Sequence, residues 1–343
     1  MRAIGFYRAG GPEVLEEMEV SDPAPSIGEV VIRPSYTSVN NLDILVRSGI
    51  AKTAMQSPYI TGTDIVGSIE SVGKGVTGLV PGEKVVASTV FGCGQCASCS
   101  KGEYILCSNW KVPGLHSRGS YGELVALPAS IVMKKPSGFS EEELGCMPLA
   151  LSASWRSIKT EARALEGETI AIRGASGNVG IFSILVAKAL GLHIIAITRS
   201  EQKAAQLRHL GAETVVIAKG AESAKEVNEA TSGLGADIVI DPIGATMNDS
   251  ISMLKNGGRL VLLGTIGGAE SNISIKNLYW KSPSIYGVHN ASLEELMDAF
   301  AEFGRKNMHP VIGRKMKITQ ASEAHGLFSS GAQFGKILLK HAW

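Results

Sequence analysis

The chain has 343 residues, and its 33 basic and 32 acidic side chains leave a formal net charge of +1. With 44% hydrophobic and 19% charged residues, it has the composition of a globular protein of about two domains. The charge balance and the 6% of aromatic residues argue against nucleic-acid binding. No apolar run reaches the roughly 20 residues of a membrane span, and the first residues lack the apolar core of a signal peptide. We therefore expect a cytoplasmic protein with no nucleic-acid or membrane partner.

The first 150 residues predict a β-rich region. Short β-type runs separated by Gly, Pro and Asn turns lie at 29–36, 64–73, 83–90 and 121–128. This spacing is typical of an antiparallel barrel or sandwich with long loops. The 40 glycines, about 12% of the chain against a usual ~7%, indicate many tight turns or close backbone approaches.

Four of the five cysteines fall within fifteen residues, at Cys93, Cys96, Cys99 and Cys107. Four thiolates suit tetrahedral Zn²⁺, and four protein ligands leave no open position, so such a site is structural. An iron–sulfur cluster or a redox disulfide pair is the alternative interpretation. The clustering is unlike a secreted disulfide scaffold, whose cysteines are spread along a short chain. Cys146 stands alone.

After residue 150 the chain alternates between strand and helix patterns. Near-continuous apolar strands with amphipathic helices between them predict a parallel sheet covered on both faces. Six such strands match a doubly wound dinucleotide-binding sheet, although this fold also binds other ligands. The expected strands are 169–173, 193–198, 214–218, 236–241, 259–264 and 284–288; the expected helices include 178–190, 200–210 and 292–307, and the tail returns to turn-rich β segments.

The first strand of this half runs directly into a glycine-rich loop and a helix. In this context Gly174 permits the turn, Gly177 lets the backbone approach a pyrophosphate, and Gly180 lets helix and strand pack closely. The helix N-terminus then offers free N–H groups to the phosphates. The cofactor-binding residues that we predict here are Gly174, Ser176, Gly177, Asn178, Val179 and Gly180.

The end of the second strand indicates which dinucleotide binds. An NAD site has an acidic residue there for the ribose hydroxyls, whereas this chain has Thr198, Arg199 and Ser200, with Lys203 one turn later. Arg199 and Ser200 suit a 2′-phosphate through charge-assisted hydrogen bonds, which favours NADPH over NADH. The competing interpretation is that Arg199 is a solvated surface residue.

These features together resemble the medium-chain dehydrogenase/reductase superfamily, which includes zinc alcohol dehydrogenases and quinone oxidoreductases. The resemblance spans nearly the whole chain: 1–16, 39–49, 61–73, the cysteine lobe, the glycine loop and 334–339. It implies a GroES-like catalytic domain at 1–149 and 300–343, with a zinc lobe at about 91–108. A Rossmann domain at 150–299 is then inserted, with the active cleft between the domains. The family also implies a homodimer or homotetramer.

The catalytic zinc site of the alcohol dehydrogenase branch does not match. Asn40 stands at the cysteine ligand, Leu42 at the proton-relay hydroxyl and Thr63 at the histidine ligand, and no ligand stands in 147–155. Neutral amides and hydroxyls do not make the N/S site that catalytic zinc requires. The pattern is similar to the zinc-free quinone oxidoreductase branch, which normally lacks the cysteine lobe. The catalytic candidates are Asn40, Asn41, Asp43, Thr63 and Asp64.

Further residues take roles from the resemblance alone. It implies that Ser152 lies beside the nicotinamide, and that Gly264 and Thr265 approach the cofactor after the fifth strand. It also implies that the carboxamide binds near Val288 and His289, that Lys336 touches the pyrophosphate, and that Tyr59 and His116 line the cleft. For each histidine, an ordinary core or surface residue is the competing interpretation.

We thus expect an NADPH-dependent reductase of quinones or α,β-unsaturated carbonyls, working without catalytic zinc. A conjugated acceptor places developing negative charge on its oxygen, and hydrogen-bond donors, with Asn40 and Asn41 the first candidates, stabilise that charge. An alcohol dehydrogenase is one alternative, although an alcohol normally needs zinc to lose its proton. An NADP(H)-binding protein without turnover is the other.

Overall fold

The computed structural model describes all 343 residues and divides them into two compact units. Unit 1 comprises 1–149, 292–300 and 309–343, and unit 2 comprises 150–291 and 301–308. The sequence placed the return to the first domain at residue 300. Helix α9 (Leu293–Arg305) instead contributes residues to both units, since the division falls within it.

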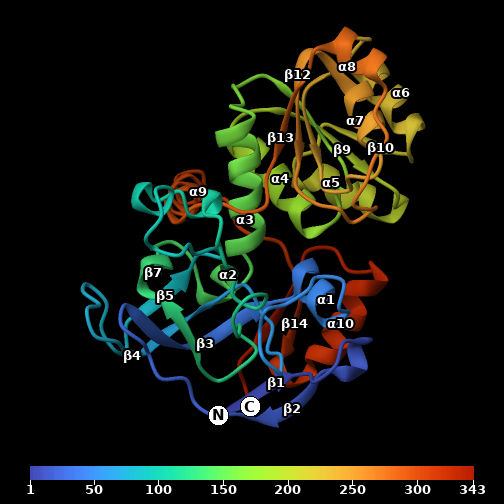
Figure 1. Ribbon diagram of the computed structural model, residues 1–343. Helices are drawn as coiled ribbons and strands as arrows, with labels where there is room; N and C mark the ends of the chain where they lie inside the picture. The colour runs from blue at the N-terminus through green and yellow to red at the C-terminus, as the bar shows by residue number, and fades with distance from the viewer. The chain divides into compact units, whose positions relative to one another are not determined.

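Unit 1 is built on a seven-stranded, mainly antiparallel sheet with a separate two-stranded hairpin. The sheet order is β14-β15-β3-β4-β5-β7, with β6 paired to β3, and β1 pairs with β2. The strands are β1 (Arg2–Gly5), β2 (Glu16–Glu19), β3 (Glu29–Ser38), β4 (Val66–Val72), β5 (Lys84–Ala87), β6 (Val125–Pro128), β7 (Val132–Lys134), β14 (Ile312–Lys317) and β15 (Lys336–Lys340). The two chain ends lie side by side in this unit (Figure 1), with the Arg2 guanidinium 5.4 Å from the ring centroid of Trp343.

Three helices belong to unit 1: α1 (Asn41–Arg47), α2 (Glu141–Leu144) and α10 (Ala321–Ser330). Helix α1 begins in a capping box, in which Asn40 and Asp43 each satisfy a backbone group of the other. Alternating apolar residues of β3, β4 and β5 fill one core of the unit, including Ile32, Ile69 and Val85. The fold therefore places the start of α1 next to the end of β3.

Unit 2 is a doubly wound sheet, and its six strands are all parallel. The order β10-β9-β8-β11-β12-β13 confirms the predicted dinucleotide-binding fold (Figure 1). Its strands are β8 (Thr169–Ile172), β9 (His193–Thr198), β10 (Thr214–Ile217), β11 (Ala236–Asp241), β12 (Leu254–Leu262) and β13 (Ser284–Gly287). Its helices are α4 (Asn178–Ala189), α5 (Ala204–Leu210), α6 (Ala221–Ala230), α7 (Met247–Met253) and α8 (Ile275–Lys281).

Helix α3 (Pro148–Trp155) leads into unit 2 and continues as a π-helical turn over Arg156–Glu161. The sheet of unit 2 buries apolar residues on both faces, as parallel strands covered by helices must. Ile170 and Ile238 on one face, and their neighbours Ala171 and Val239 on the other, are all fully buried. None of the helices in either unit has the length and apolar character to cross a bilayer.

Candidate functional site

The four clustered cysteines converge in unit 1 around two short 3₁₀ turns, Cys99–Lys101 and Tyr104–Leu106. Their four sulfur atoms lie within 4.8 Å of one another, with Cys96 Sγ 3.5 Å and Cys93 Sγ 3.9 Å from Cys99 Sγ. A tetrahedral zinc ion with Zn–S bonds of ~2.3 Å holds its sulfurs ~3.8 Å apart. The lobe therefore has the geometry of a four-thiolate zinc site.

The local backbone of this lobe favours thiolates. A Cβ on Gly92 would lie 2.3 Å from Cys99 Sγ, so only glycine leaves room for the sulfur there. The backbone amides of Cys93 and Asn109 donate to Cys107 Sγ at 3.4 and 3.3 Å. Hydrogen bonds, first from the Gln95 amide, lower the pKa of Cys93 to about 6, whereas burial raises the pKa of Cys99 to about 11. These residues fit one structural zinc ion, which would be held by Cys93, Cys96, Cys99 and Cys107.

The glycine loop of unit 2 has the form of a phosphate cradle. Gly174 has a positive φ of 58°, and a Cβ on Gly180 would lie 2.4 Å from Gly174 O, so turn and helix can meet only without side chains. Helix α4 starts at Gly177 with no side-chain cap, and Gly177 is exposed. The glycine loop thus leads into the N-terminus of α4, whose partial positive charge suits a dinucleotide pyrophosphate.

The residues after β9 lie beside this loop. Thr198 Oγ1 lies 3.2 Å from Ser176 Oγ and accepts a hydrogen bond from the Ser200 amide at 3.1 Å. The Arg199 guanidinium is exposed and forms no ion pair or hydrogen bond within the chain. Burial lowers the pKa of Lys203. The strand end thus offers a cation and hydroxyl groups where an NAD site has a carboxylate.

The other residues predicted to contact the cofactor, apart from Lys336 of unit 1, lie on several elements of the same unit. Gly264 follows β12, and its Cα packs so closely on Pro242 O that a Cβ would lie 2.5 Å away. Thr265 and His289 are exposed, whereas Ser152 on α3 and Val288 after β13 are buried. Their roles toward a cofactor remain those that the resemblance implies.

A buried polar cluster in unit 1 contains Asn40 and Asp64, which lie in the segments that the resemblance aligns with the ligands of catalytic zinc. Asp64 Oδ2 accepts hydrogen bonds from Ser38 Oγ at 2.5 Å, Asn40 Nδ2 at 2.9 Å and Lys336 Nζ at 3.1 Å. Its Oδ1 accepts from the Leu149 amide at 2.8 Å. Lys336 Nζ also donates to Asn40 Oδ1 at 2.6 Å. Both members of the Asp64–Lys336 ion pair are at most 1% exposed.

The side chain of Asn40, expected to donate to substrate, makes its hydrogen bonds within the fold. The side-chain nitrogen of Asn40, Nδ2, already donates to Asp64 Oδ2 and to Ser38 O, so both of its N–H groups have acceptors. Asn41 is half-buried, and its side chain has no hydrogen-bond partner in the chain. Lys336, expected at the pyrophosphate, instead has its ammonium on Asp64 and Asn40.

Asp43 has the contacts of a structural carboxylate. Its Oδ2 accepts a hydrogen bond from the backbone N–H of Asn40 at 2.8 Å. Its Oδ1 accepts hydrogen bonds from Thr61 Oγ1 at 2.9 Å and from the backbone N–H of Gly62 at 3.0 Å. Burial raises the pKa of Asp43 to about 6, against the lowering effect of these hydrogen bonds. Asp43 therefore ties the start of α1 to the segment that carries Thr63 and Asp64.

A catalytic zinc ion does not fit these residues. Asn40 and Thr63 present an amide and a hydroxyl where thiolate and imidazole are needed, and the Lys336 ammonium is bound to the Asp64 carboxylate. Thr63 Oγ1 is buried and has no hydrogen-bond partner. Burial raises the pKa of Cys146 to about 12, so this neighbouring thiol stays protonated. The cluster supplies its own cation.

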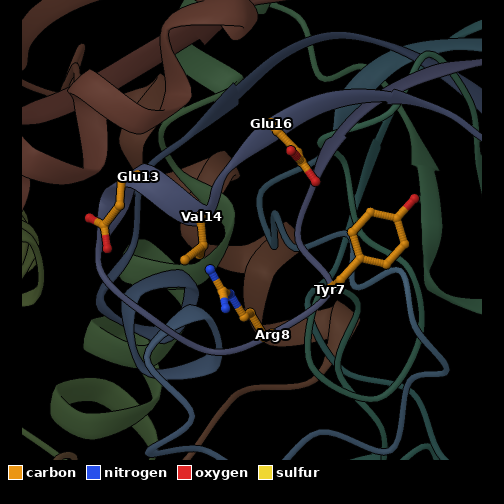
Figure 2. A pocket seen from close by; sticks show the side chains of 5 residues that line it. All are labelled: Tyr7, Arg8, Glu13, Val14 and Glu16. Atoms are coloured by element: carbon orange, nitrogen blue, oxygen red, sulfur yellow. The ribbon is translucent and has the colours of Figure 1, made fainter.

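Two further predicted residues contact their surroundings in unit 1. His116 Nδ1 accepts the Val112 amide at 3.0 Å, and the Tyr59 ring packs 5.3 Å from that of Phe6. A surface pocket of the same unit holds none of the predicted site residues. Figure 2 shows it lined by Tyr7, Arg8, Glu13, Val14 and Glu16, with the Arg8 guanidinium near Val14.

Sequence reasoning missed two partners of the buried cluster, Ser38 and the ammonium of Lys336. The residues that they contact lie 26 to 296 positions away along the chain, so no local motif joins them. It also missed Arg173 and Asp241 in unit 2, which form a buried ion pair at 3.2 Å. Arg173 and Asp241 could have been found, because each stands at the end of an apolar strand where a charged residue is unusual.

Two family models and a solved structure show which protein family this chain belongs to. A family model described as alcohol dehydrogenase GroES-like domain matches residues 26–137, and one described as zinc-binding dehydrogenase matches 178–304. A crystal structure of an NAD-dependent alcohol dehydrogenase superposes with a TM-score of 0.91 at 31% identity, covering 100% of both chains. The chain belongs to the medium-chain dehydrogenase/reductase superfamily. It is therefore an NAD(P)-dependent oxidoreductase.

Two curated relatives show the range of this superfamily. The chain is 28% identical to an acryloyl-coenzyme A reductase of Metallosphaera sedula over 332 residues, which cover 96% of this chain and 97% of that protein. It is 28% identical to a quinone oxidoreductase of Rattus norvegicus over 349 residues, covering 99% and 97%. The relatives thus include enzymes named for conjugated acceptors as well as alcohol dehydrogenases.

Proposed function

We propose that this enzyme is an NADPH-dependent reductase of α,β-unsaturated carbonyl compounds or quinones that works without catalytic zinc. One observation carries the proposal: the Lys336 ammonium is bound to Asp64 and Asn40 where the family's metal would lie. The names of the acryloyl-coenzyme A reductase and quinone oxidoreductase relatives support the same class of acceptor.

The chain's own residues supply donors for a developing negative charge. A lysine ammonium has three N–H groups, and Lys336 uses two of them within the cluster. The Thr63 hydroxyl is buried beside Asp64 with no partner. NADPH, when bound, supplies the hydride. We infer that Lys336 and Thr63, which are as buried as Asn40 but keep unused donor hydrogens, stabilise negative charge on the acceptor oxygen, the part that sequence analysis gave to Asn40 and Asn41.

A matched substrate panel tests the reaction class. Enones, enoyl thioesters and quinones should oxidise NADPH, and simple primary and secondary alcohols should not reduce NADP⁺ at matched concentrations. Activity should survive a chelator that leaves the zinc lobe intact. Chelator-sensitive alcohol oxidation faster than any enone or quinone reduction would contradict the proposal and favour a zinc alcohol dehydrogenase. Tight NADPH binding with no turnover on the whole panel would favour the non-catalytic alternative.

The cofactor preference rests on Arg199, whose exposed guanidinium has no partner in the chain. We expect Arg199→Ala to weaken NADPH binding by about 1–3 kcal/mol, the cost of one charge-assisted hydrogen bond, and to leave NADH binding unchanged. Fluorescence titration with both cofactors measures this. Arg208→Ala, at another exposed arginine of unit 2, is the control. Equal weakening for both cofactors would show that Arg199 does not contact the 2′-phosphate.

We also propose that the protein is a homo-oligomer, a dimer or a tetramer. Strand β13 is a sheet edge paired only with β12, and the adjoining helix α8 exposes Ile275, Tyr279 and Trp280. Two copies related by a twofold axis can pair such edges with each other, since an edge strand is self-complementary. Light scattering should give a mass of two or four times 36.1 kDa, and Trp280→Glu should reduce it. A monomeric parent protein would refute this.

A further inference from the structure

A buried ion pair in unit 2 joins two strands at the point where the strand order of the sheet reverses. From β8 the chain builds outward through β9 and β10, and it then returns to build β11, β12 and β13 on the other side. In open α/β sheets, ligands bind outside the carboxyl ends of the strands at this switch point. Arg173 follows β8 directly and Asp241 ends β11, so the pair lies at the carboxyl ends of these two neighbouring strands.

One nitrogen of the Arg173 guanidinium makes all of its hydrogen bonds. Nη1 donates to Ser250 Oγ at 2.6 Å, to Thr246 O at 3.0 Å and to Asp241 Oδ2 at 3.2 Å. Ser250 Oγ in turn donates to Asp241 Oδ2 at 2.6 Å. Arg173 is 4% exposed and Asp241 is fully buried. The guanidinium therefore links the end of β8 to both ends of the β11–α7 connection.

The carboxylate of Asp241 shapes the turn that follows it. Its Oδ1 accepts the amides of Ile243 at 2.8 Å and Gly244 at 3.1 Å. Gly244 has a φ of 80°, and a Cβ there would lie 2.9 Å from Gly264 O. The Gly267 amide donates to Ile243 O at 2.9 Å. The turn after β11 and the loop after β12 therefore pack backbone to backbone.

We propose that Arg173 is a positioning residue for the dinucleotide. Through Asp241 it fixes the backbone of the turn after β11, and through that turn the loop of Gly264 and Thr265, relative to the glycine loop that starts one residue after Arg173. The cofactor then meets a preformed set of backbone groups on both sides of the switch point. Because the guanidinium is buried, we place it behind these loops and not in contact with the cofactor. The proposal needs only NAD(P) binding, so it stands apart from the choice of substrate.

Charge-balanced variants separate positioning from stability. Arg173→Met leaves Asp241 as an uncompensated buried charge, which destabilises a fold strongly. The double variant Arg173→Met/Asp241→Asn removes both charges and keeps an oxygen for the Ile243 and Gly244 amides. We expect the double variant to recover the thermal midpoint of the parent but to bind NADPH and NADH roughly tenfold more weakly. Turnover at saturating cofactor should change little, because Arg173 does not touch reacting atoms.

A second ion pair of the same unit provides the matched control. Arg259 on β12 forms a bidentate pair with Glu168, which directly precedes β8, at the opposite ends of the strands. Arg259→Met/Glu168→Gln should leave both cofactor affinities at the parent value.

Fluorescence titration of NADPH and of NADH measures the affinities without any substrate, so failure of the reductase proposal does not affect the result. Arg173→Lys keeps the buried positive charge, so this variant should fold even if Arg173→Met does not. We expect it to have the thermal midpoint of the parent and to lose part of the cofactor affinity. Parent-like cofactor affinity in the folded Arg173 variants, or an equal loss in the Arg259 control, would overturn the proposal.

Discussion

Two polar clusters of unit 1 differ in what they can hold, although the superfamily resemblance places a zinc ion at each. In the cysteine lobe, four sulfurs within 4.8 Å of one another have no cation of the protein among them. In the cluster around Asp64, the Lys336 ammonium is bound to the carboxylate and to Asn40. The first cluster offers four sulfur ligands to a cation from outside, and the second already binds a cation of the protein. Charge balance within a cluster therefore distinguishes a metal site from its metal-free counterpart.

The same difference separates their roles. The lobe offers four ligands and leaves no position for substrate, so a zinc ion held there would contribute to folding. The Asp64 cluster retains an unpaired hydroxyl at Thr63 and an unused ammonium proton on Lys336, which are donors available for chemistry. Reductases of conjugated acceptors can use such donors, because the electron pair moves to an oxygen that they stabilise.

The largest expected effect is the loss of the lobe's metal. Cys99→Ser removes one of four thiolates, and we expect zinc to fall from one ion per chain to none, with a loss of unfolding free energy of at least about 5 kcal/mol. Elemental analysis and thermal unfolding measure this. Turnover per folded molecule should change far less than stability.

Cys146→Ser is the control for this experiment, because Cys146 is a buried cysteine outside the lobe. Its zinc content should equal that of the parent. Two zinc ions per chain in the parent protein, the second lost on mild chelation together with activity, would remove the contrast between the clusters.

Sequence analysis was most reliable where neighbouring residues determine the structure. The glycine loop was predicted because its strand, turn and helix lie within about twenty residues, and the confirmed strand order of unit 2 follows from the alternation of apolar strands and helices. The cysteines were found for the same reason, since their spacing is local. Helix α10 was missed, because Ser, His and Gly residues weaken its pattern and burial of Ala321, Ala324 and His325 holds it in place.

The Asp64 cluster could not be assembled from sequence. Lys336 lies 272 residues from Asp64 and 296 from Asn40, and only the pairing of β15 with β3 brings them together. Its position in a motif predicted that Asn40 donates to substrate, but its side-chain nitrogen already donates to Ser38 O and Asp64. The chemistry of a residue at a motif position therefore depends on partners that the motif does not contain.

The next effect sharpens the role of the internal cation. Lys336→Met leaves the Asp64 carboxylate buried without its partner, and we expect a loss of about 3–5 kcal/mol in unfolding free energy. Turnover of an enone should fall by about 10²–10³ if the ammonium stabilises the developing oxyanion. Lys336→Arg, which keeps the charge, should recover most of the stability.

Lys315→Met is the control, because Lys315 forms an exposed ion pair with Glu142, and such pairs contribute about 0–1 kcal/mol. Full enone turnover in a folded Lys336→Met protein would mean that the cluster is only structural.

The smallest of the three effects is a pH dependence located at Asp43, next to Asn40. Burial raises the pKa of Asp43 from 3.8 to about 6, and the nearby Asp64 adds to the rise. Between these values the folded protein keeps a proton that the unfolded chain releases, so the contribution of this group to stability falls as pH rises from about 4 to 6. A shift of about two units corresponds to roughly 3 kcal/mol. The difference in unfolding free energy between the parent and Asp43→Asn, measured by urea denaturation across this range, isolates Asp43 from the buried histidines.

The control for this prediction is excess Zn²⁺. A divalent cation bound in the Asp64 cluster would lower the pKa of Asp43 and so change the pH dependence. Because we expect no metal to bind there, excess Zn²⁺ should leave the free-energy difference unchanged. A difference that is flat with pH, or that Zn²⁺ abolishes, would mean that the Asp64 cluster binds metal or that Asp43 is ionised throughout.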